Sequence, residues 1–413
     1  MSSEWRSGKL GEFIELKRGY DLAQAKRIPG PYPLVSSAGV SDCHSIPMAK
    51  GPGVVTGRYG TIGQVYFVEQ DFWPLNTTLY VRNFKGNDPK FISYFLKTVD
   101  FLAYSDKAAV PGVNRNHLHE AFAQIPDLGA QLNIAEVLGA FDDRITLLRE
   151  TNATLEAIAQ ALFKSWFVDF DPVRAKLEGR VPEGMEEATA AVFPDGFEES
   201  ELGLVPRRWR VLPIGDAVAA VGGATPDTKN PAYWEPAVHC WTTPKDLSGI
   251  AAPVLLDTER KLSDEGLAKI GSGALPIGTL LLSSRAPIGY LALAQVPLAI
   301  NQGYIAMLPG GLLPPLYMLF WCRQNMENIK GRANGSTFME ISKKAFRPIP
   351  ALVPPPEIVQ EFVEVAGVLF ERLIENEKQA QTLATLRDTL LPRLISGQLR
   401  LPEVIALVEG DLA

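Results

Sequence analysis

Several short patterns in the sequence combine residue types that enzymes use, and each has a simpler structural interpretation. Asn230-Pro231-Ala232-Tyr233 differs by one residue from the Asn-Pro-Pro-Tyr box of amino-methyltransferases, in which these groups hold the target amine. Such an enzyme also needs a Gly-rich S-adenosylmethionine loop of the form FxGxG, which the sequence lacks. We therefore expect a turn here, with asparagine before proline.

A second pattern fits a loose nuclease signature. Pro226-Asp227 followed by Glu259-Arg260-Lys261 matches PD…ExK, in which carboxylates bind Mg²⁺ and a lysine steadies the attacking water. The pattern arises by chance in long chains, and the first half of the sequence has no counterpart. We do not assign a nuclease site to it.

The other candidate metal ligands are scattered along the chain. Asp169 and Asp171 could share a metal ion, but a carboxylate pair beside a proline more often caps a helix or a turn. The pairs Cys43-His44, His239-Cys240 and His117-x-His119 are isolated, and no GxxxxGK[ST] phosphate loop occurs. The sequence therefore predicts no catalytic residue, no metal site and no nucleotide-driven motor.

Side chains suited to recognition are better represented. Arg58 and Arg285 stand on Gly-flanked turns, where a guanidinium could fork onto guanine O6 and N7 or grip a phosphate. Asparagine and glutamine can read adenine edges. The expected DNA contacts of these kinds are Arg58, Asn76, Arg115, Arg285, Asn301, Gln302, Lys330, Arg332, Lys343 and Lys344. For any one arginine, a structural ion pair is the alternative.

The sequence contains a long internal repeat. Trp5-x4-Leu10-Gly11 recurs as Trp209-x4-Ile214-Gly215 at an offset of 204 residues, and Thr154-Leu155 recurs as Thr382-Leu383 at an offset of 228. The run RYGTIG (58–63) recurs, one residue shorter, as RAPIG (285–289). A period of this length indicates a duplicated unit, a domain followed by a helix.

The domain in each copy mixes short strands with helices. Residues 53–68 and 278–294 are β-rich runs broken by Gly and Pro, and residues 89–105 and 314–330 have helical patterns. We expect an α+β fold: two α/β-mixed globular domains separated by two long antiparallel coiled-coil helices, with an internal pseudo-two-fold repeat.

Two heptad patterns predict helices of roughly 35 residues, or ~50 Å, each with one apolar seam that needs a partner. The seams run through Leu138, Phe141, Ile145, Leu148, Asn152, Leu155, Ala159 and Leu162, and through Phe362, Ala366, Leu369, Leu373, Asn376, Ala380 and Leu383. If the helices are antiparallel and the two asparagines face each other, paired residues obey i + j = 152 + 376 = 528. A solvated position on a rotated face is the alternative for either asparagine.

Composition and charge limit the class of protein. The 413 residues are 46% hydrophobic and 21% charged, which indicates several buried cores. Three cysteines without a CxxC pair exclude a disulfide framework, and neither a membrane span nor a signal-peptide pattern is evident, so we expect a soluble, cytoplasmic protein. The net charge of −7 combines basic blocks, +2 over 1–128 and +4 over 201–353, with acidic blocks of −8 and −5. Basic domains can approach phosphate even in an acidic chain.

These patterns divide the chain into six segments. The two domains are expected at residues 1–128 and 206–353, and the two long helices at 129–176 and 354–398. Residues 177–205, which are acidic and punctuated by Pro and Gly, are expected to form a linker, and residues 399–413 a C-terminal tail.

Three stretches resemble the specificity subunits of type I restriction–modification systems. ALFKSWFVDFDP (161–172) looks like the family's central conserved region, and LRDTLLPRLISG (386–397) looks like its distal one. GGATP (222–226), followed by NPAYW (230–234) and WTTPKD (241–246), is similar to a common start of target-recognition domains, and it implies DNA contacts by Thr242 and Lys245. The first domain departs from that pattern, with Gly19-Tyr20-Asp21 in place of a Gly-Thr-Pro-type start.

The resemblance implies a non-catalytic subunit that binds double-stranded DNA, each target-recognition domain reading one half of a split target. The long helices would dock two modification subunits, which are adenine-N6 methyltransferases, and restriction (motor-nuclease) subunits would join them. S-adenosylmethionine, ATP and Mg²⁺ are then expected on the partner subunits and none on this chain. The expected subunit-contact residues on the helices are Leu138, Phe141, Ile145, Leu148, Asn152, Leu155, Leu162, Trp166, Leu369, Leu373, Asn376, Leu383 and Leu390. Two other classes stay open, a solitary nuclease or methyltransferase and a scaffold protein without a DNA role.

Overall fold

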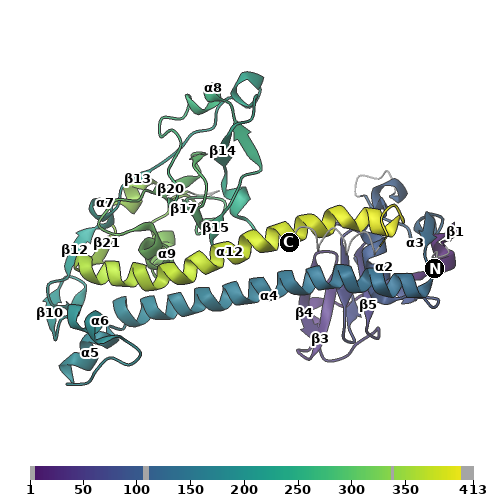
Figure 1. Cartoon of the computed structure of the whole chain (residues 1–413), viewed down its shortest axis with the longest axis horizontal. Coiled ribbons are helices and arrows are strands. Elements are labelled where there is room, and N and C mark those ends of the chain that lie inside the picture. Colours follow the sequence, from purple (N-terminus) through teal and green to yellow (C-terminus); the bar gives the residue numbers. More distant parts are fainter. Residues whose placement is uncertain (1–4, 106–110, 336–338, 401–413) are drawn as a thin grey trace. The chain divides into compact units, whose positions relative to one another are not determined.

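The computed structural model describes residues 5–105, 111–335 and 339–400. The chain forms two compact units, Met1–Ile145 together with Gln381–Ala413 (unit 1) and Thr146–Ala380 (unit 2). Helices α4 (Leu128–Phe167) and α12 (Pro356–Ile395) each contribute residues to both units and are drawn as long continuous ribbons in Figure 1. Residues 401–413 of the expected C-terminal tail lie outside the described residues.

The described part of unit 1 contains three sheets. A four-stranded antiparallel sheet has the order β2-β8-β5-β6, a three-stranded sheet has the order β4-β3-β7, and β1 pairs with β9. The strands are β1 (Arg6–Lys9), β2 (Glu15–Arg18), β3 (Tyr32–Ser36), β4 (Gly39–His44), β5 (Gly53–Gly57), β6 (Val65–Val68), β7 (Trp73–Pro74), β8 (Thr78–Asn83) and β9 (Phe122–Ile125). Its shorter helices are α1 (Leu10–Phe13), α2 (Pro89–Lys97) and α3 (Arg115–His119).

Unit 2 contains the corresponding sheets with additions. The main sheet has the order β13-β20-β17-β18-β15, the smaller one β16-β14-β19, and β12 pairs with β21. The strands are β12 (Arg210–Pro213), β13 (Ala220–Val221), β14 (His239–Thr242), β15 (Val254–Leu255), β16 (Arg260–Leu262), β17 (Leu280–Ser283), β18 (Leu291–Ala294), β19 (Leu298–Ile300), β20 (Tyr304–Met307) and β21 (Pro350–Val353). The short helices that follow β12 in this unit are α7 (Ile214–Ala217), α8 (Asp264–Leu267), α9 (Pro315–Gln324), α10 (Met326–Gly331) and α11 (Lys343–Phe346).

The strand orders confirm the predicted internal repeat. The order β2-β8-β5-β6 of unit 1 recurs as β13-β20-β17-β18 in unit 2, and β4-β3-β7 recurs as β16-β14-β19. Helices α2 and α9 both begin at a proline, which suits the first helical position because its missing N–H has no partner there. The longer segment of the second copy supplies β15 at one edge of the main sheet.

Aromatic side chains build the core that joins the second domain to the long helices in unit 2. Phe163 and Phe167 of α4 contact Phe362 of α12 edge-on, with ring centroids 5.6 and 5.2 Å apart. Tyr317 and Phe320 of α9 pack on the same rings. Buried aromatic pairs of this geometry add about 0.5–1.5 kcal/mol each to the stabilisation from burial. In unit 1, the core includes residues of both long helices, among them Leu138 and Leu394.

The predicted asparagine register is confirmed within unit 2. Asn376 Nδ2 donates to Asn152 Oδ1 over 2.9 Å, and Asn152 Nδ2 donates to the Leu373 carbonyl over 3.1 Å. Both side chains are 2% exposed. The two helices are therefore antiparallel here, and their polar seam positions satisfy each other rather than facing solvent.

The segment expected to form a linker carries ordered elements packed on unit 2. α4 ends at Phe167, and α5 (Asp171–Leu177) then begins next to Pro172. α6 (Glu187–Val192) and the hairpin of β10 (Phe197–Ser200) with β11 (Gly203–Pro206) follow. Phe193 is 1% exposed and meets Trp166 edge-on at 5.2 Å. A few well-placed aromatic residues anchor this acidic stretch without any periodic pattern.

In the described part of the chain, no helix is at once long enough and apolar enough to cross a membrane.

Candidate nucleic-acid interface

In unit 1, the predicted side chains gather around the loop that follows β5. Arg58 Nε donates to the Val113 carbonyl over 3.2 Å, and the Arg58 guanidinium lies 4.5 Å above the Tyr59 ring. Two residues further along, Arg115 is exposed on the first turn of α3, whose N-cap Asn114 accepts the N–H of Asn116. Arg58 and Arg115 therefore lie on neighbouring loops that are tied together at Val113.

Asn76 lies in the same unit but is already engaged. Its amide nitrogen donates to Asp21 Oδ1, and Arg18 forms an ion pair with the same carboxylate at 3.3 Å. The Gly-Tyr-Asp start of the first domain thus meets Asn76. Beside this contact, hydrogen bonds with Tyr80 (3.0 Å) and Lys17 (3.1 Å) lower the pKa of Tyr20.

In unit 2, Arg285 lies in a loop that a buried serine holds closed. Ser283 Oγ donates to the Pro287 carbonyl over 2.8 Å and accepts the N–H groups of Gly289 and Tyr290. Arg285 Nη1 lies 3.7 Å from Glu340 Oε2, and the two backbones form a β-bridge. The ion-pair alternative therefore holds for Arg285 in this conformation, although about a third of its side chain stays exposed.

Asn301 and Gln302 have internal partners next to this loop. Asn301 Oδ1 accepts the Gly303 N–H over 2.8 Å, and Gln302 Oε1 accepts the Thr225 hydroxyl over 2.7 Å. Gln302 is exposed and Asn301 half-buried. Each side chain therefore stands at the surface with one polar group committed to its own loop.

The structure corrects one expected DNA contact. Thr242 has no exposed surface, and its hydroxyl is 3.0 Å from the Tyr304 hydroxyl. Burial raises the pKa of Tyr304, so this phenol stays neutral and can share a hydrogen bond with Thr242. Thr242 thus supports the end of β14 from inside and cannot touch a DNA surface directly.

Five further basic side chains are exposed on unit 2. Lys245 pairs with Glu259 at 3.3 Å, Lys330 pairs with Glu327 at 3.7 Å, and Arg332 Nε donates to Asn328 over 3.1 Å. Such exposed pairs contribute roughly 0–1 kcal/mol to stability. Lys343 and Lys344 open α11, three and four residues after Glu340.

The backbone corrects the alignment of the two arginine loops. Gly63 N–H bonds to Gly57 O, and Gly289 N–H bonds to Ser283 O, so both loops have the same length. Arg58 N–H bonds to Thr77 O, and Ser284 N–H bonds to Gly303 O. Arg58 therefore corresponds to Ser284, and Arg285 corresponds to Tyr59.

Residues of the candidate catalytic motifs make structural contacts instead of forming a shared site. Asn230 caps a 3-10 turn (Pro231–Tyr233), as expected, by accepting the Ala232 N–H over 3.1 Å. Asp171 accepts the Ser165 hydroxyl at the start of α5, and Asp169 pairs with Lys164. In the nuclease-like pattern, Lys261 pairs with Asp257 instead of joining Asp227. Across residues 5–105, 111–335 and 339–400, no three His, Cys, Asp or Glu side chains are grouped to hold a metal ion.

Sequence reasoning missed three polar or aromatic residues of this surface. Tyr59 lies in the loop after β5, Glu340 pairs with Arg285 of the loop after β17, and Arg260 lies 3.6 Å above the Trp234 ring. Tyr59 could have been found from the constant offset of 226 residues that relates Gly57 to Ser283 and Gly63 to Gly289. Glu340 and Arg260 carry no signal in the sequence, because their partners are set by the fold.

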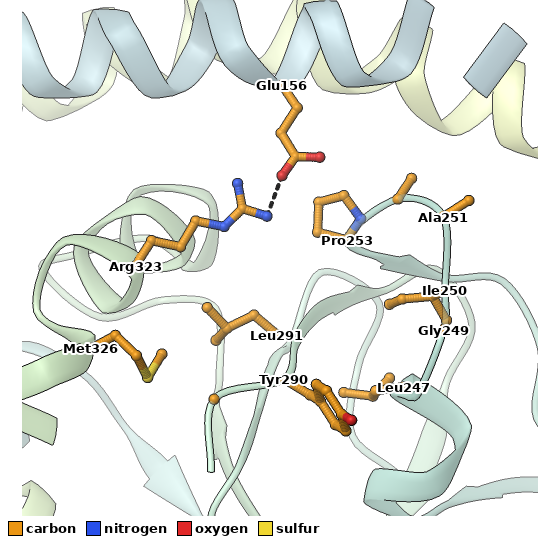
Figure 2. A pocket seen from close by; sticks show the side chains of 12 residues that line it. Glu156, Leu247, Gly249, Ile250, Ala251, Pro253, Tyr290, Leu291, Arg323 and Met326 are labelled. Carbon is orange, nitrogen blue, oxygen red and sulfur yellow. Dashed lines mark ion pairs between the residues drawn. The ribbon is translucent and has the colours of Figure 1, made fainter. Parts of the chain in front are cut away.

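Unit 2 also has a pocket of about 420 Å³ between the second domain and α4, which Figure 2 shows. Arg323 of α9 reaches across it to Glu156 of α4, and Pro253, Leu291 and Met326 line the rest. The only two charged lining residues neutralise each other. We therefore assign the pocket to the joint between domain and helix and not to DNA.

The residues expected at subunit contacts are covered by the chain itself. They are buried or half-buried: Leu138, Phe141, Ile145, Leu148, Asn152, Leu155, Leu162, Trp166, Leu369, Leu373, Asn376, Leu383 and Leu390. Seam residues pack inside their unit because an apolar stripe is buried first against the nearest matching stripe. A partner subunit would have to use other faces of α4 and α12.

The sequence is similar to those of known proteins over most of its length. A family model described as the type I restriction modification DNA specificity domain matches residues 2–157 and 206–384. The specificity subunit of the HindI type I restriction enzyme of Haemophilus influenzae is 26% identical over 388 residues, covering 82% of this chain and 84% of that protein. The MjaIX specificity subunit of Methanocaldococcus jannaschii is 36% identical over 185 residues, which is 44% of this chain and 42% of that relative.

A solved structure shows the same fold. The S subunit of a type I restriction–modification system from M. genitalium has a TM-score of 0.57 and 17% sequence identity, covering 95% of this chain and 96% of that one. The family match extends over both copies of the repeat, each with its loop after β5 or β17 and its share of a long helix. The chain therefore belongs to the family of type I restriction–modification DNA specificity proteins.

Proposed function

We propose that the chain is the DNA-recognition subunit of a type I restriction–modification complex and that each unit reads one half of a split DNA target. It supplies sequence recognition and no chemistry of its own. Adenine-N6 methyl transfer would reside in two modification subunits that bind S-adenosylmethionine. ATP- and Mg²⁺-dependent cleavage would reside in restriction subunits. The target is the cell's own DNA, which puts the proposed activity in the cytoplasm.

One observation carries this proposal: the same loops recur on the same sheet of both units with different side chains. Unit 1 presents Arg58, Tyr59 and Arg115, and unit 2 presents Arg285 and Lys343 at the places of Tyr59 and Arg115, with the buried Ser284 at the place of Arg58. Two copies of one scaffold that differ at the exposed loop positions suit the reading of two different sequences. Phosphate contacts by the basic residues would position each unit, and base contacts would specify.

A titration of the full chain with duplex DNA tests recognition. The probe carries the sequence that methylation-sensitive sequencing finds modified in the host DNA, and the comparisons have either half scrambled. We expect affinity to fall steeply with salt and to drop when either half is scrambled. Equal affinity for all three duplexes would refute a specificity subunit and favour the scaffold alternative.

The surface for modification subunits is expected on the exposed apolar side chains of the long helices. On α4, Leu147 and Ile158 are each 51% exposed and lie eleven residues apart, close to three helical turns, so they share one face. On α12, Val365 and Val368 are 45% and 66% exposed. Exposed apolar residues grouped on one helix face are typical of protein–protein contacts.

A paired substitution tests this docking surface. Leu147→Asp with Ile158→Asp should abolish co-purification of the modification subunit, because two carboxylates would be buried without partners. DNA affinity of the chain alone should stay within about threefold. Ala153→Asp, an exposed position on another face of α4, is the matched control. Normal assembly of the double variant would place the docking surface elsewhere.

A further inference from the structure

The two loops that follow β5 and β17 differ at one position whose surroundings also differ. In both loops the third residue has a left-handed backbone, with φ of 76° at Gly60 and 52° at Ala286. An alanine in that region is strained, and such strain persists where the fold overdetermines a turn, often at functional sites. The residue just before this turn is Tyr59 in unit 1 and Arg285 in unit 2.

The segment that hydrogen-bonds to the loop also differs between the two units at the corresponding position. Val113 N–H bonds to Arg58 O over 3.0 Å, and Ile341 N–H bonds to Ser284 O over the same distance, so Gly112 corresponds to Glu340. A Cβ at Gly112 would lie 2.2 Å from Tyr59 Cε1, so the ring rests directly on that glycine. The contact between Tyr59 and Gly112 in unit 1 thus corresponds to the contact between Arg285 and Glu340 in unit 2.

Glu340 argues against a simple phosphate contact by Arg285. A carboxylate 3.7 Å from the guanidinium repels phosphate and competes for the same charge. The ion pair at 3.7 Å attracts one side of a planar guanidinium that has five donors, and it leaves the other N–H groups available. A guanidinium oriented in this way is suited to a bidentate contact with guanine O6 and N7. The exposed lysines at 343 and 344 are left to bind phosphate.

Tyr59 is held with comparable stiffness. Its ring rests against Gly112, and the Arg58 guanidinium, whose Nε is itself tied to the Val113 carbonyl, lies over the ring. Tyr59 as a whole is 36% exposed. The part of the ring that stays exposed offers apolar contact to a base edge or thymine methyl, which is a different preference from that of arginine.

We propose that Tyr59 and Arg285 are the matched specificity-determining residues of the two units and that Glu340 is the positioning residue that holds Arg285 for base readout. The proposal rests on the proposed function and adds to it the position at which the two half-sites are told apart. Unit 2 would read guanine at this position through Arg285. Unit 1 would make an apolar contact through Tyr59.

The test measures affinities of the full chain at one fixed salt concentration. The three duplexes are the sequence found methylated in the host, that sequence with the first half scrambled, and that sequence with the second half scrambled. Arg285→Ala should weaken binding to the intact target about 10- to 100-fold. The loss of affinity on scrambling should then disappear for one half of the target and remain for the other. Tyr59→Ala should remove the penalty for scrambling the other half.

Arg285→Lys serves as the second variant because it keeps the charge and loses the fork. It should lose discrimination at the same half-site while binding scrambled duplexes as the wild type does. Glu340→Gln should weaken binding to the intact target about 3- to 10-fold while scrambled duplexes bind equally or more tightly, and Glu340→Asp should restore part of the difference. Glu265→Gln, an exposed glutamate of α8, is the matched control.

Two outcomes would overturn the inference and leave the proposed function intact. One is that Arg285→Ala weakens all three duplexes equally with a shallower salt dependence, which is the behaviour of a phosphate contact. The other is that Glu340→Gln weakens all three duplexes equally and lowers the melting temperature, which is the behaviour of a structural ion pair. A wild-type chain that does not distinguish the three duplexes would instead refute the proposed function itself.

Discussion

Asn152 and Asn376 form a closed polar contact inside an apolar seam. Each is 2% exposed, and the amide of one donates to the carbonyl oxygen of the other over 2.9 Å. A lone buried amide would cost roughly 1–3 kcal/mol, so the two residues are tolerated because each satisfies the other. The contact also disfavours a shift along the helices, which would separate the two amides.

Removing one asparagine should therefore cost more than removing both. Asn152→Leu or Asn376→Leu alone should lower the stability of unit 2 by about 1–3 kcal/mol, because one amide remains buried without its partner. The double variant should recover much of that loss. Thermal unfolding of the four chains in a double-mutant cycle measures the coupling. Gln379→Leu, an exposed amide on α12, is the control, and additive effects would contradict the pairing.

At the residue scale, the sequence could reveal which side chains pair only where a pattern constrained them. The heptad spacing and the repeat offset together led to the contact between Asn152 and Asn376. The same reasoning misaligned Arg58 with Arg285, because pairing the two arginines placed a one-residue deletion in the second loop. The backbone hydrogen bonds show that the two loops have the same length. Thr242 sits in a polar motif, WTTPKD, yet it is buried, since a sequence motif does not say which face of a strand is covered.

The attachment of each domain to the long helices uses different chemistry in the two units. In unit 1, the Tyr94 hydroxyl of α2 donates to Asp142 Oδ2 over 2.5 Å, and Arg387 of α12 pairs with the same carboxylate. The corresponding positions in unit 2, at offsets of 226 and 228 residues, are Phe320 and Phe370, with rings 5.7 Å apart. A polar network in one unit is thus an aromatic contact in the other.

This difference should make unit 1 the acid-sensitive unit. Burial alone would raise the pKa of Asp142, but the hydrogen bonds from Tyr94 and Arg387 outweigh it and hold that pKa below its usual value. A depressed carboxylate pKa stabilises the folded state above the unfolded pKa of about 3.9, and the gain is lost as pH falls through the folded value. The unit 2 aromatic contact has no such titration.

We expect the difference in stability between the wild-type chain and the Asp142→Asn variant to depend on pH. At pH 7, Asp142→Asn should lower the stability of unit 1 by about 1–3 kcal/mol, since Arg387 loses a charged hydrogen-bond partner. The gap should narrow once the pH falls below about 4, where the wild-type carboxylate also becomes neutral. Melting curves between pH 3 and pH 7 measure it, with exposed Asp143→Asn as the control. A gap that stays constant over this range would exclude a charged Asp142 as its cause.

The elements with strong periodic or positional signals were predictable, and the others were not. Both long helices follow from their seams, and the α+β domains follow from strand runs broken by Gly and Pro. Segment 177–205 gave no such signal, because Phe193 and Trp166 meet through the fold rather than through spacing along the chain. The short edge strand β15 has only two residues, too few for any alternation to show.

The whole molecule combines two units whose connectivity differs. Unit 2 is one continuous stretch, Thr146–Ala380, whereas unit 1 combines Met1–Ile145 with Gln381–Ala413. The second half of α12 returns to the first domain and adds buried leucines to its core: Leu390, Leu391 and Leu394, next to Ile395 and Leu399. The first domain is therefore incomplete until α12 has been made.

A chain ending after Ala380 should keep unit 2 and lose unit 1. Burying a leucine or isoleucine side chain contributes about 1.5–3 kcal/mol, so removing Leu390, Leu391, Leu394 and Ile395 withdraws about 6–12 kcal/mol. That is comparable to the entire stability of an ordinary domain. Hydrogen exchange followed by mass spectrometry should show protected amides in β17 and β20 and rapid exchange in β5 and β8. A chain ending after Arg400 is the control and should protect all four strands. Protection of β5 and β8 in the shorter chain would show that the first domain folds without α12, and recognition of its half-site should then survive the truncation as well.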